Sequence, residues 1–197
     1  MLVLVTSADI EHPLKEMRTE EYRKTILWMK KNLGDNSLAW IECVRDSGSF
    51  IEDYHPVFYS NVNNSKFRNM GANWGKAIEE FILSHDIHEE FIAHVTGRYH
   101  LKDKYFIDTI EANPDYDVFA KDDGHSQYFT GCFAMRAKYF IDWIYQTDWN
   151  WLNTTMTNLE KSVWNYSKNK NLKCYEFDSL HIDCNIFGNG FPTRLQL

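Results

Sequence analysis

Short apolar runs alternate with stretches of helical spacing along most of the chain. Residues 2–5 (LVLV) form an uncharged run bounded by polar residues, which is typical of a buried strand. From Pro13, which suits a first helical turn, apolar side chains recur at helical spacing to Leu33, and Gly34 ends the pattern. The same patterns predict further strands at 38–44, 56–62, 91–95, 116–120, 128–135 and 172–177, and helices at 73–83, 102–111, 138–145 and 157–167.

This alternation predicts an α/β domain whose central, mostly parallel sheet is flanked by helices. With 197 residues the chain has the length of one domain, so we expect a single domain over residues 1–197. The tail at 185–197 is expected to be an extension or the beginning of a truncated segment. Such folds bind ligands at the carboxyl ends of their strands, so the residues that follow each strand matter most for function.

Composition and charge narrow the classes of protein. Hydrophobic residues make up 44% and charged residues 25%, which is typical of a folded soluble domain. A net charge of −7 without a long basic run argues against non-specific nucleic-acid binding. The same charge is compatible with a local basic pocket for a small phosphorylated ligand. The four cysteines lack zinc-finger spacing, and no apolar stretch reaches about 18–20 residues. We therefore expect free thiols, a cytoplasmic location and no membrane span.

Polar residues follow the first two predicted strands. Thr6, Ser7 and Asp9 come after the first strand. The small hydroxyl residues let a ligand ring approach the backbone, and Asp9 can accept hydrogen bonds from a uracil or a ribose. Alternatively, Thr6 or Asp9 caps the following helix. Arg45 follows the second strand, where it can pair with a phosphate or lie in solvent.

The segment after the strand at 91–95 carries the most chemistry. Gly97 permits a sharp chain reversal or the close approach of a ligand. Arg98 brings a permanent charge that a diphosphate or a buried acid can meet, and Tyr99 can stack or donate a hydrogen bond. A plain turn needs neither Arg98 nor Tyr99, so we interpret the segment from Thr96 to Tyr99 as part of a ligand site.

Carboxylates and a histidine follow two later strands. Asp122 and Asp123 come after the strand at 116–120, where they can ligate a hard cation, act as acid and base groups, or form a common Asp-Gly turn. His181 and Asp183 follow the last predicted strand and lie on one side of an extended segment. They form a second candidate pair of metal ligands.

We do not expect His85, His88 and His94 to form a zinc site. The HExxH pattern is absent, because Ile92 stands four residues after His88. His94 lies inside an apolar strand, so we expect it to be a hydrogen-bonded histidine of the core.

Two other segments are ambiguous. Segment 69–76 contains two glycines but matches no nucleotide-binding loop pattern. A helix N-terminus there, with Lys76 in its first turn, can receive an anion. The favoured alternative is that the glycines ease packing of a helix on the sheet. The aromatic residues at 143–151 form a platform for an acceptor sugar or pack against the sheet, and packing is favoured.

These segments together resemble a known family. VLVTSAD at 3–9, FIAHVTGRYHL at 91–101 and YFTGCFAMRAKYF at 128–140, with Glu160 downstream, are similar to small glycosyltransferases of the GT-A type. Such domains are encoded by bacterial polysaccharide clusters and by large DNA viruses, chlorella viruses among them. The resemblance covers about residues 2–188 and implies a GT-A-like nucleotide-binding sandwich with a mixed central sheet.

The resemblance implies sugar transfer from a nucleotide-sugar, most often a UDP-sugar such as UDP-glucose, to a glycan or glycoprotein acceptor. It implies Mn²⁺ or Mg²⁺ on the diphosphate and, for a viral protein, action in the host cytoplasm. Candidate catalytic residues are Glu160 as acid or base, with Asp122 and Asp123 beside the donor sugar or the acceptor. Candidate donor-binding residues are Thr6, Ser7, Asp9, Arg45, Thr96, Gly97, Arg98 and Tyr99.

The chain departs from the family in one motif. The family commonly carries Asp-X-Asp at the end of the strand that corresponds to 91–95, where this chain has HVTGR. The literal Asp-X-Asp at 115–117 begins a predicted strand, which is the wrong end for a ligand site. We therefore expect that Arg98 takes over part of the cation's role or that ligands come from elsewhere, such as His181 and Asp183.

Two alternative functions follow from the same residues. The missing Asp-X-Asp favours a catalytically weak nucleotide-sugar-binding module of a longer multidomain protein. A nucleotidyltransferase would need a Gly-rich basic loop after the first strand, and TSADIEHP at 6–13 is not such a loop.

Overall fold

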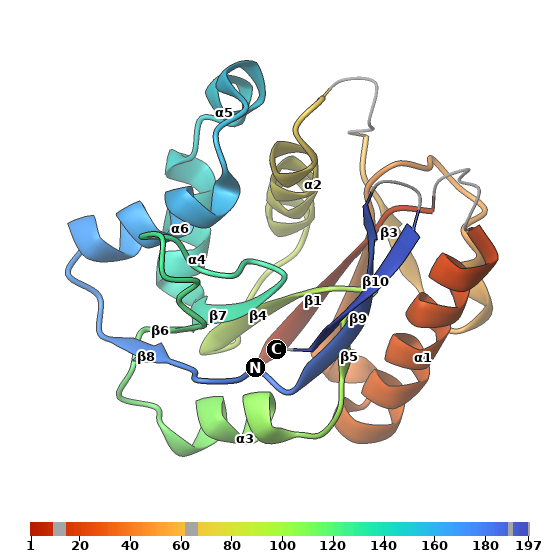
Figure 1. The fold of residues 1–197 in the computed structure, drawn as a ribbon. Coiled ribbons are helices and arrows are strands. Elements are labelled where there is room, and N and C mark those ends of the chain that lie inside the picture. Colours follow the sequence, from red (N-terminus) through yellow and green to blue (C-terminus); the bar gives the residue numbers. More distant parts are fainter. Residues whose placement is uncertain (10–14, 62–66, 189–190, 197) are drawn as a thin grey trace.

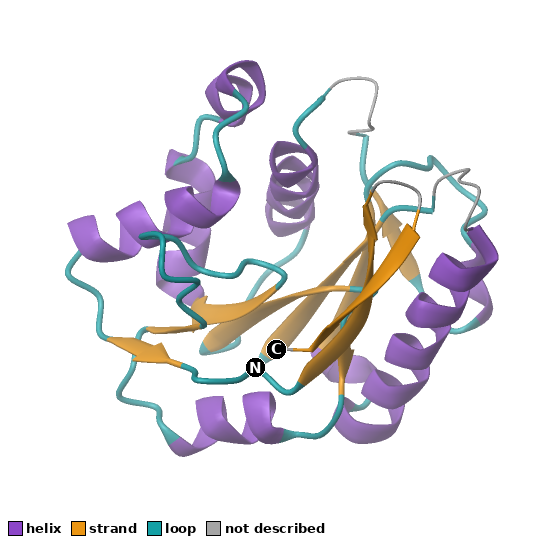
Figure 2. Cartoon of the chain, in the orientation of Figure 1, coloured by secondary structure: helices purple, strands orange, loops and turns teal. Residues whose placement is uncertain are grey.

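The fold is built around a central sheet of seven strands (Figures 1 and 2). This computed structural model describes residues 1–9, 15–61, 67–188 and 191–196. Pro13 lies outside them. The strands of this sheet are β1 (Leu2–Ser7), β2 (Leu38–Glu42), β3 (Val57–Tyr59), β4 (Phe91–Thr96), β6 (Val118–Ala120), β7 (Cys132–Arg136) and β8 (Cys174–Glu176). Their order across the sheet is β3-β2-β1-β4-β7-β6-β8.

Strand direction in this sheet brings several chain segments to one edge. β3, β2, β1 and β4 run parallel, whereas β7 runs antiparallel to both β4 and β6. Cys132, at the start of β7, therefore lies opposite Val95, near the end of β4. The edge at which β1 and β4 end is thus also the edge at which β7 begins. The predicted α/β class with a mostly parallel mixed sheet is confirmed.

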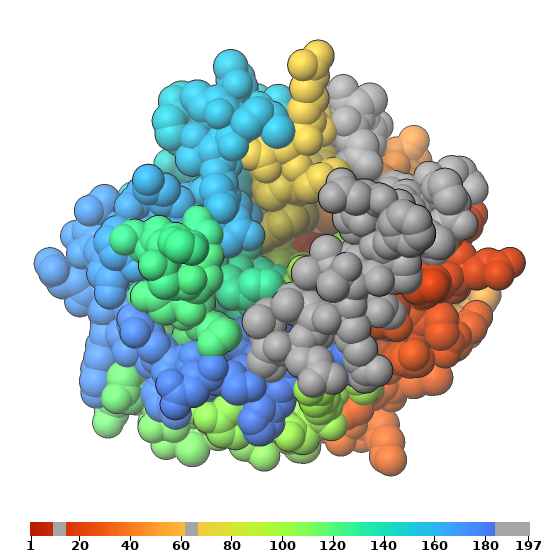
Figure 3. All heavy atoms as spheres, in the orientation of Figure 1, coloured from red at the N-terminus to blue at the C-terminus, as the bar shows by residue number. Residues whose placement is uncertain are grey.

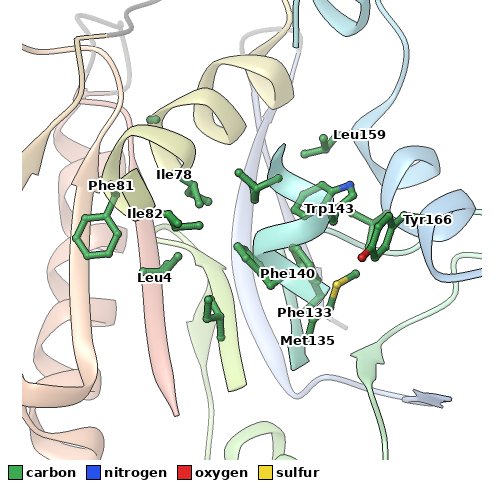
Figure 4. Packing of buried hydrophobic residues seen from close by; sticks show 14 of the residues in the cluster. Leu4, Ile78, Phe81, Ile82, Phe133, Met135, Phe140, Trp143, Leu159 and Tyr166 are labelled. Atoms are coloured by element: carbon green, nitrogen blue, oxygen red, sulfur yellow. The ribbon is translucent and has the colours of Figure 1, made fainter. Parts of the chain in front are cut away.

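Helices cover both faces of the sheet. Leu2 and Leu4 of β1 point to the face that α2, α4, α5 and α6 cover, and Figure 4 shows Leu4 packed near Phe81 of α2. Val3 and Val5 point to the opposite face, which α1 and α3 cover, because side chains alternate along a strand. The helices are α1 (Lys15–Leu33), α2 (Met70–Ser84), α3 (Tyr105–Ala112), α4 (Ala137–Gln146), α5 (Trp149–Thr155) and α6 (Leu159–Asn169).

The region from 182 onward forms strands that the sequence did not predict. β9 (Ile182–Gly188) pairs antiparallel with β10 (Phe191–Gln196) and with the two-residue β5 (His100–Leu101). In Figure 1 this hairpin crosses in front of the central sheet. Part of the tail expected as an extension therefore belongs to a second sheet, of three strands. A two-residue strand such as β5 is too short to carry an alternating pattern.

The aromatic segment at 143–151 divides between the core and the surface. Trp143 and Trp149 are buried, whereas Trp151 is 54% exposed. Asp148 begins α5, which was not predicted, by accepting a hydrogen bond from the backbone N–H of Trp151. The packing interpretation therefore holds for Trp143 and Trp149.

The described residues bear on two expectations, that the cysteines are free thiols and that no helix spans a membrane. Cys43, Cys132 and Cys174 are free thiols, and burial raises the pKa of each. None of the described helices combines the length and the apolarity that crossing a bilayer requires.

Gly75 allows α2 and α5 to approach each other closely. A Cβ atom built on Gly75 would overlap the indole ring of Trp149. Gly71 plays a similar part, because a Cβ there would lie 3.0 Å from the Cβ of Leu159 in α6. The two glycines of segment 69–76 thus serve packing as predicted, but against helices and not against the sheet.

We expect Gly75→Ala to lower the free energy of unfolding by up to about 2 kcal/mol, measured by urea denaturation. Overpacking against Trp149 costs about 1–3 kcal/mol, and the gain in helix propensity of about 1 kcal/mol offsets part of it. In the double variant with Trp149→Leu the loss should be smaller than the sum of the two single losses. Strict additivity would contradict this account of the contact.

Candidate functional site

A pocket of about 700 Å³ opens at the sheet edge where β1 and β4 end and β7 begins. It is larger than the two other main cavities of the described residues, of about 400 and 450 Å³. Figure 3 shows a recess below the yellow atoms of α2, with red atoms from the beginning of the chain at its bottom. The polar and charged residues that line the pocket are Thr6, Ser7, Arg18, Tyr22, Arg68, Asn69, Thr96, Arg98, Tyr99, Thr130, Asn158 and Glu160.

Two helices begin at the rim of this pocket. Asn69 caps α2 by accepting hydrogen bonds from the backbone N–H groups of Gly71 and Ala72. Asn158 caps α6 by accepting from the backbone N–H of Glu160. These caps fix the first turns of both helices and so the positions of the side chains that they present to the pocket.

His94 of β4 lies under the floor of the pocket and is completely buried. Its Nδ1 atom is 2.9 Å from the carbonyl oxygen of Thr130, and its Nε2 atom is 2.9 Å from Oγ1 of Thr6. Burial lowers the pKa of His94 to about 4, so the ring is neutral at pH 7. Because a carbonyl oxygen only accepts, Nδ1 carries the single proton and Nε2 accepts the hydroxyl hydrogen of Thr6. The expected hydrogen-bonded core histidine is confirmed.

Ser7 is held by a buried carboxylate. Its hydroxyl donates to Oε2 of Glu42 at 2.6 Å. Glu42 also accepts from the backbone N–H groups of Asp9 and Val44, so it fixes the chain just after β1 and β2. Burial raises the pKa of Glu42. Sequence reasoning missed this residue because it lies inside the apolar strand predicted at 38–44 and belongs to no motif.

Asp9 and Arg45 lie beside the pocket and bind each other. Nε of Arg45 is 2.8 Å from Oδ2 of Asp9 and 2.9 Å from its carbonyl oxygen. Neither residue lines the 700 Å³ pocket. The two residues that were each predicted to meet the donor thus form an ion pair that ties the segment after β1 to the segment after β2.

Arginines supply positive charge to the pocket from separate segments. Arg98 follows β4, Arg18 lies on α1 and Arg68 precedes α2, and all three line the pocket. A guanidinium nitrogen of Arg18 donates to the carbonyl oxygen of Ala8 at 3.3 Å. Burial lowers the pKa of Arg18, and the nearby charge of Arg98 lowers it further. An anion in the pocket would offset both effects.

Arg18 and Arg68 were not among the predicted residues. Arg18 lies within a long helix rich in charged residues, and Arg68 precedes a helix in a segment without a motif. Only the fold shows that they face the same pocket as Arg98.

Tyr99 and Gly97 contribute in different ways. Tyr99 lines the pocket and stacks on Phe129, with ring centroids 5.4 Å apart. Gly97 does not line the pocket, because its free space is filled by protein: a Cβ atom there would lie 2.9 Å from ring atoms of Trp40 and Tyr22. Its small size therefore serves packing behind the pocket wall and not, as one expectation had it, the approach of a ligand.

Of the predicted catalytic carboxylates, Glu160 lines the pocket. It lies in the first turn of α6, and its Oε1 atom accepts a hydrogen bond from Oγ1 of Thr130 at 2.9 Å. Asp122 and Asp123 lie outside the pocket lining. Asp122 accepts from the N–H of Gly124 at 2.8 Å and Asp123 from the N–H of His125 at 3.0 Å, a pattern of turns.

The predicted metal ligands lie away from the pocket lining. Nδ1 of His181 is 2.8 Å from Oδ2 of Asp103, and its ring stacks on Tyr105. Asp183 pairs in register with His100 of β5. Among the described residues there is no group of three or more His, Cys, Asp or Glu side chains arranged to hold a metal ion. Asp117, which belongs to the literal Asp-X-Asp, directly precedes β6 and so lies at the sheet edge opposite the pocket. Its Oδ1 atom accepts a hydrogen bond from Nε of Arg136 at 3.2 Å.

Comparison with known proteins bears on the fold. No protein-family model and no curated protein matches the chain significantly. A solved structure assigned as a nucleotide-diphospho-sugar transferase from Desulfovibrio desulfuricans G20 is 11% identical with a TM-score of 0.58, over 89% of this chain and 78% of that one. A glycosyltransferase involved in glycosylation of the major capsid of PBCV-1 is 11% identical with a TM-score of 0.55, over 90% and 82%.

A cytidylyltransferase from Leptospira borgpetersenii is similar to the same extent. It is 9% identical with a TM-score of 0.56, over 89% of this chain and 74% of that one. Sugar transferases and nucleotidyltransferases thus share this architecture, and the resemblance seen in the sequence is confirmed at the level of the fold. The chain has a GT-A-like fold of the kind found in nucleotide-diphospho-sugar transferases and in a chlorella virus glycosyltransferase.

Proposed function

We propose that the protein is a glycosyltransferase that moves a sugar from a UDP-sugar, such as UDP-glucose, to a hydroxyl group of a glycan or glycoprotein. The proposal rests on one observation, that the same pocket is lined by two kinds of polar group. Arg18 and Arg98 supply cationic donors, whereas Thr6, Ser7 and Thr130 line the pocket where β1 ends and just before β7 begins. A nucleotide-sugar offers both matching chemistries, a diphosphate and several hydroxyl or N–H groups.

The arginines suit the diphosphate. A guanidinium group can pair with phosphate oxygens through two parallel hydrogen bonds. Negative charge builds on the diphosphate as it leaves the sugar, and fixed cationic donors stabilise that charge in the transition state. Because burial and the charge of Arg98 both lower the pKa of Arg18, binding an anion relieves an unfavourable arrangement in the free protein.

Glu160 suits the role of general base. In the proposed step the acceptor oxygen attacks the anomeric carbon, the bond from that carbon to the diphosphate oxygen breaks, and the nucleoside diphosphate leaves with the electron pair. The acceptor proton passes to the carboxylate of Glu160. Oε1 of Glu160 already accepts a hydrogen bond from Thr130, which fixes the orientation of the carboxylate.

The described pocket does not fit a dedicated site for Mn²⁺ or Mg²⁺. Proteins usually hold these ions through one or two carboxylates together with substrate phosphates. Glu160 is the single carboxylate among the described residues that line the pocket, and it is assigned here to the acceptor. We therefore propose that Arg18 and Arg98 take the place of the cation that the family commonly uses.

The scarcity of carboxylates also supports a second proposal. The chain would then be a nucleotide-sugar-binding module of a longer multidomain protein, with weak catalysis of its own. Both proposals require donor binding at Arg98, and only the first requires a base at Glu160.

We expect Arg98→Ala to weaken UDP-glucose binding by about 1.5–3 kcal/mol, or about 10- to 150-fold, measured by calorimetric titration. The loss follows from removing a charged donor from the diphosphate. Arg23→Ala is the matched control, because Arg23 lies outside the pocket and binds Tyr54 and Glu20. Equal affinity of the Arg98 variant and the wild type would show that Arg98 is structural.

Glu160→Gln should lower turnover by about 10²–10⁴-fold and leave donor affinity within about two-fold. The amide keeps the shape and the contact with Thr130 but cannot take the acceptor's proton. Asp123→Asn serves as the control, because Asp123 lies outside the pocket lining. Turnover at the wild-type rate would remove Glu160 from the reaction, and absence of turnover in the wild type would favour the binding module.

We expect EDTA to leave the affinity for UDP-glucose unchanged, because the arginines are proposed to offset the charge of the diphosphate. Affinity is measured before and after chelation and again with added Mn²⁺. A loss on chelation that Mn²⁺ restores would contradict the arginine-only site and show that the chain holds a cation.

A further inference from the structure

Three hydroxyl groups of the pocket share one property: each gives its hydrogen to the protein. Thr6 donates to Nε2 of His94, Ser7 donates to Glu42, and Thr130 donates to Glu160. A hydroxyl group has a single hydrogen and two lone pairs. Once the hydrogen is committed inward, the oxygen can only accept a hydrogen bond from a ligand.

His94 determines the direction of the hydrogen bond of Thr6. The ring is completely buried, and Trp74 stacks on it with centroids 4.2 Å apart and planes 11° apart. Because the carbonyl oxygen of Thr130 holds the proton on Nδ1, Nε2 has no hydrogen to give. Thr6 must therefore donate to His94, and an exchange of donor and acceptor would require the opposite tautomer.

We propose that His94 is a specificity-determining residue that sets Thr6 as a hydrogen-bond acceptor for the nucleoside, and that Thr6 reads the N3–H group of uracil. This inference rests on the proposed function. Uracil presents a hydrogen at N3, whereas cytosine presents a lone pair there. A lone pair of Thr6 Oγ1 stabilises the first and repels the second, so the pocket prefers a uridine nucleotide although His94 never touches the ligand.

His94→Leu tests this inference because leucine offers Thr6 no hydrogen-bond acceptor. The hydroxyl of Thr6 is then free to donate outward, which removes the basis for preferring uracil. Thr6→Val gives a second test that leaves His94 in place, since valine has the β-branched shape of threonine without the hydroxyl group. His85→Leu is the matched control, because His85 is exposed and lines a different cavity, beside Pro56 and Phe58.

The readout is the ratio of the dissociation constants of CDP and UDP, measured by calorimetric titration. We expect a preference for UDP of about ten-fold in the wild type and in His85→Leu, and less than about three-fold in His94→Leu and Thr6→Val. UDP binding with the same ratio in both site variants would overturn the inference while leaving the proposed function intact. Failure of the wild type to bind UDP, CDP or UDP-glucose would overturn the proposed function as well.

The tautomer of His94 gives a check that does not depend on any ligand. Nitrogen NMR of the full chain labelled at histidine should show His94 with a protonated Nδ1 and an unprotonated Nε2 at pH 7. A protonated Nε2 would reverse the hydrogen bond to Thr6 and overturn the inference, even where His94→Leu fails to fold.

Discussion

One buried imidazole ties together the three strands on which the pocket depends. His94 belongs to β4, its Nε2 atom binds Thr6 at the end of β1, and its Nδ1 atom binds the backbone just before β7. A buried polar ring without both partners would be costly, so the two bonds hold the strand ends in one arrangement. Thr6, Arg98 and Thr130 take their positions relative to one another from that arrangement. The antiparallel course of β7 makes it possible, because it brings Thr130 to the edge where β1 and β4 end.

Local pattern was sufficient to predict the parts of the fold that are periodic. The strands near Val5 and Val95 and the long helix that ends at Leu33 have clear apolar spacing, and the structure has them. The strand expected at 128–135 begins only at Cys132. The backbone of Tyr128 is held instead by Glu160, 32 positions further along the chain, and such a distant contact leaves no trace in local spacing.

Pocket residues were predictable from the sequence where they directly follow a strand, and unpredictable where they lie on a helix or in another loop. Thr6, Ser7, Arg98 and Tyr99 follow strand ends, and they line the pocket. Arg18 comes from a helix that passes over the same edge, so only the tertiary fold identifies it. Asp9 and Arg45 also follow strands, but they do not line the pocket.

Asp9 and Arg45 also show why position alone does not assign a role. Each has the right position after a strand, but the two lie close enough to satisfy each other. An acidic protein of net charge −7 thus concentrates positive charge in one pocket and uses other charges to hold the loops around it.

The most direct measurement is a crystal structure of the protein with UDP-glucose bound. The account predicts the diphosphate within hydrogen-bonding distance of the guanidinium groups of Arg18 and Arg98, and the sugar on the side of Glu160. A diphosphate bound elsewhere, or held by a metal ion without contact to either arginine, would contradict it.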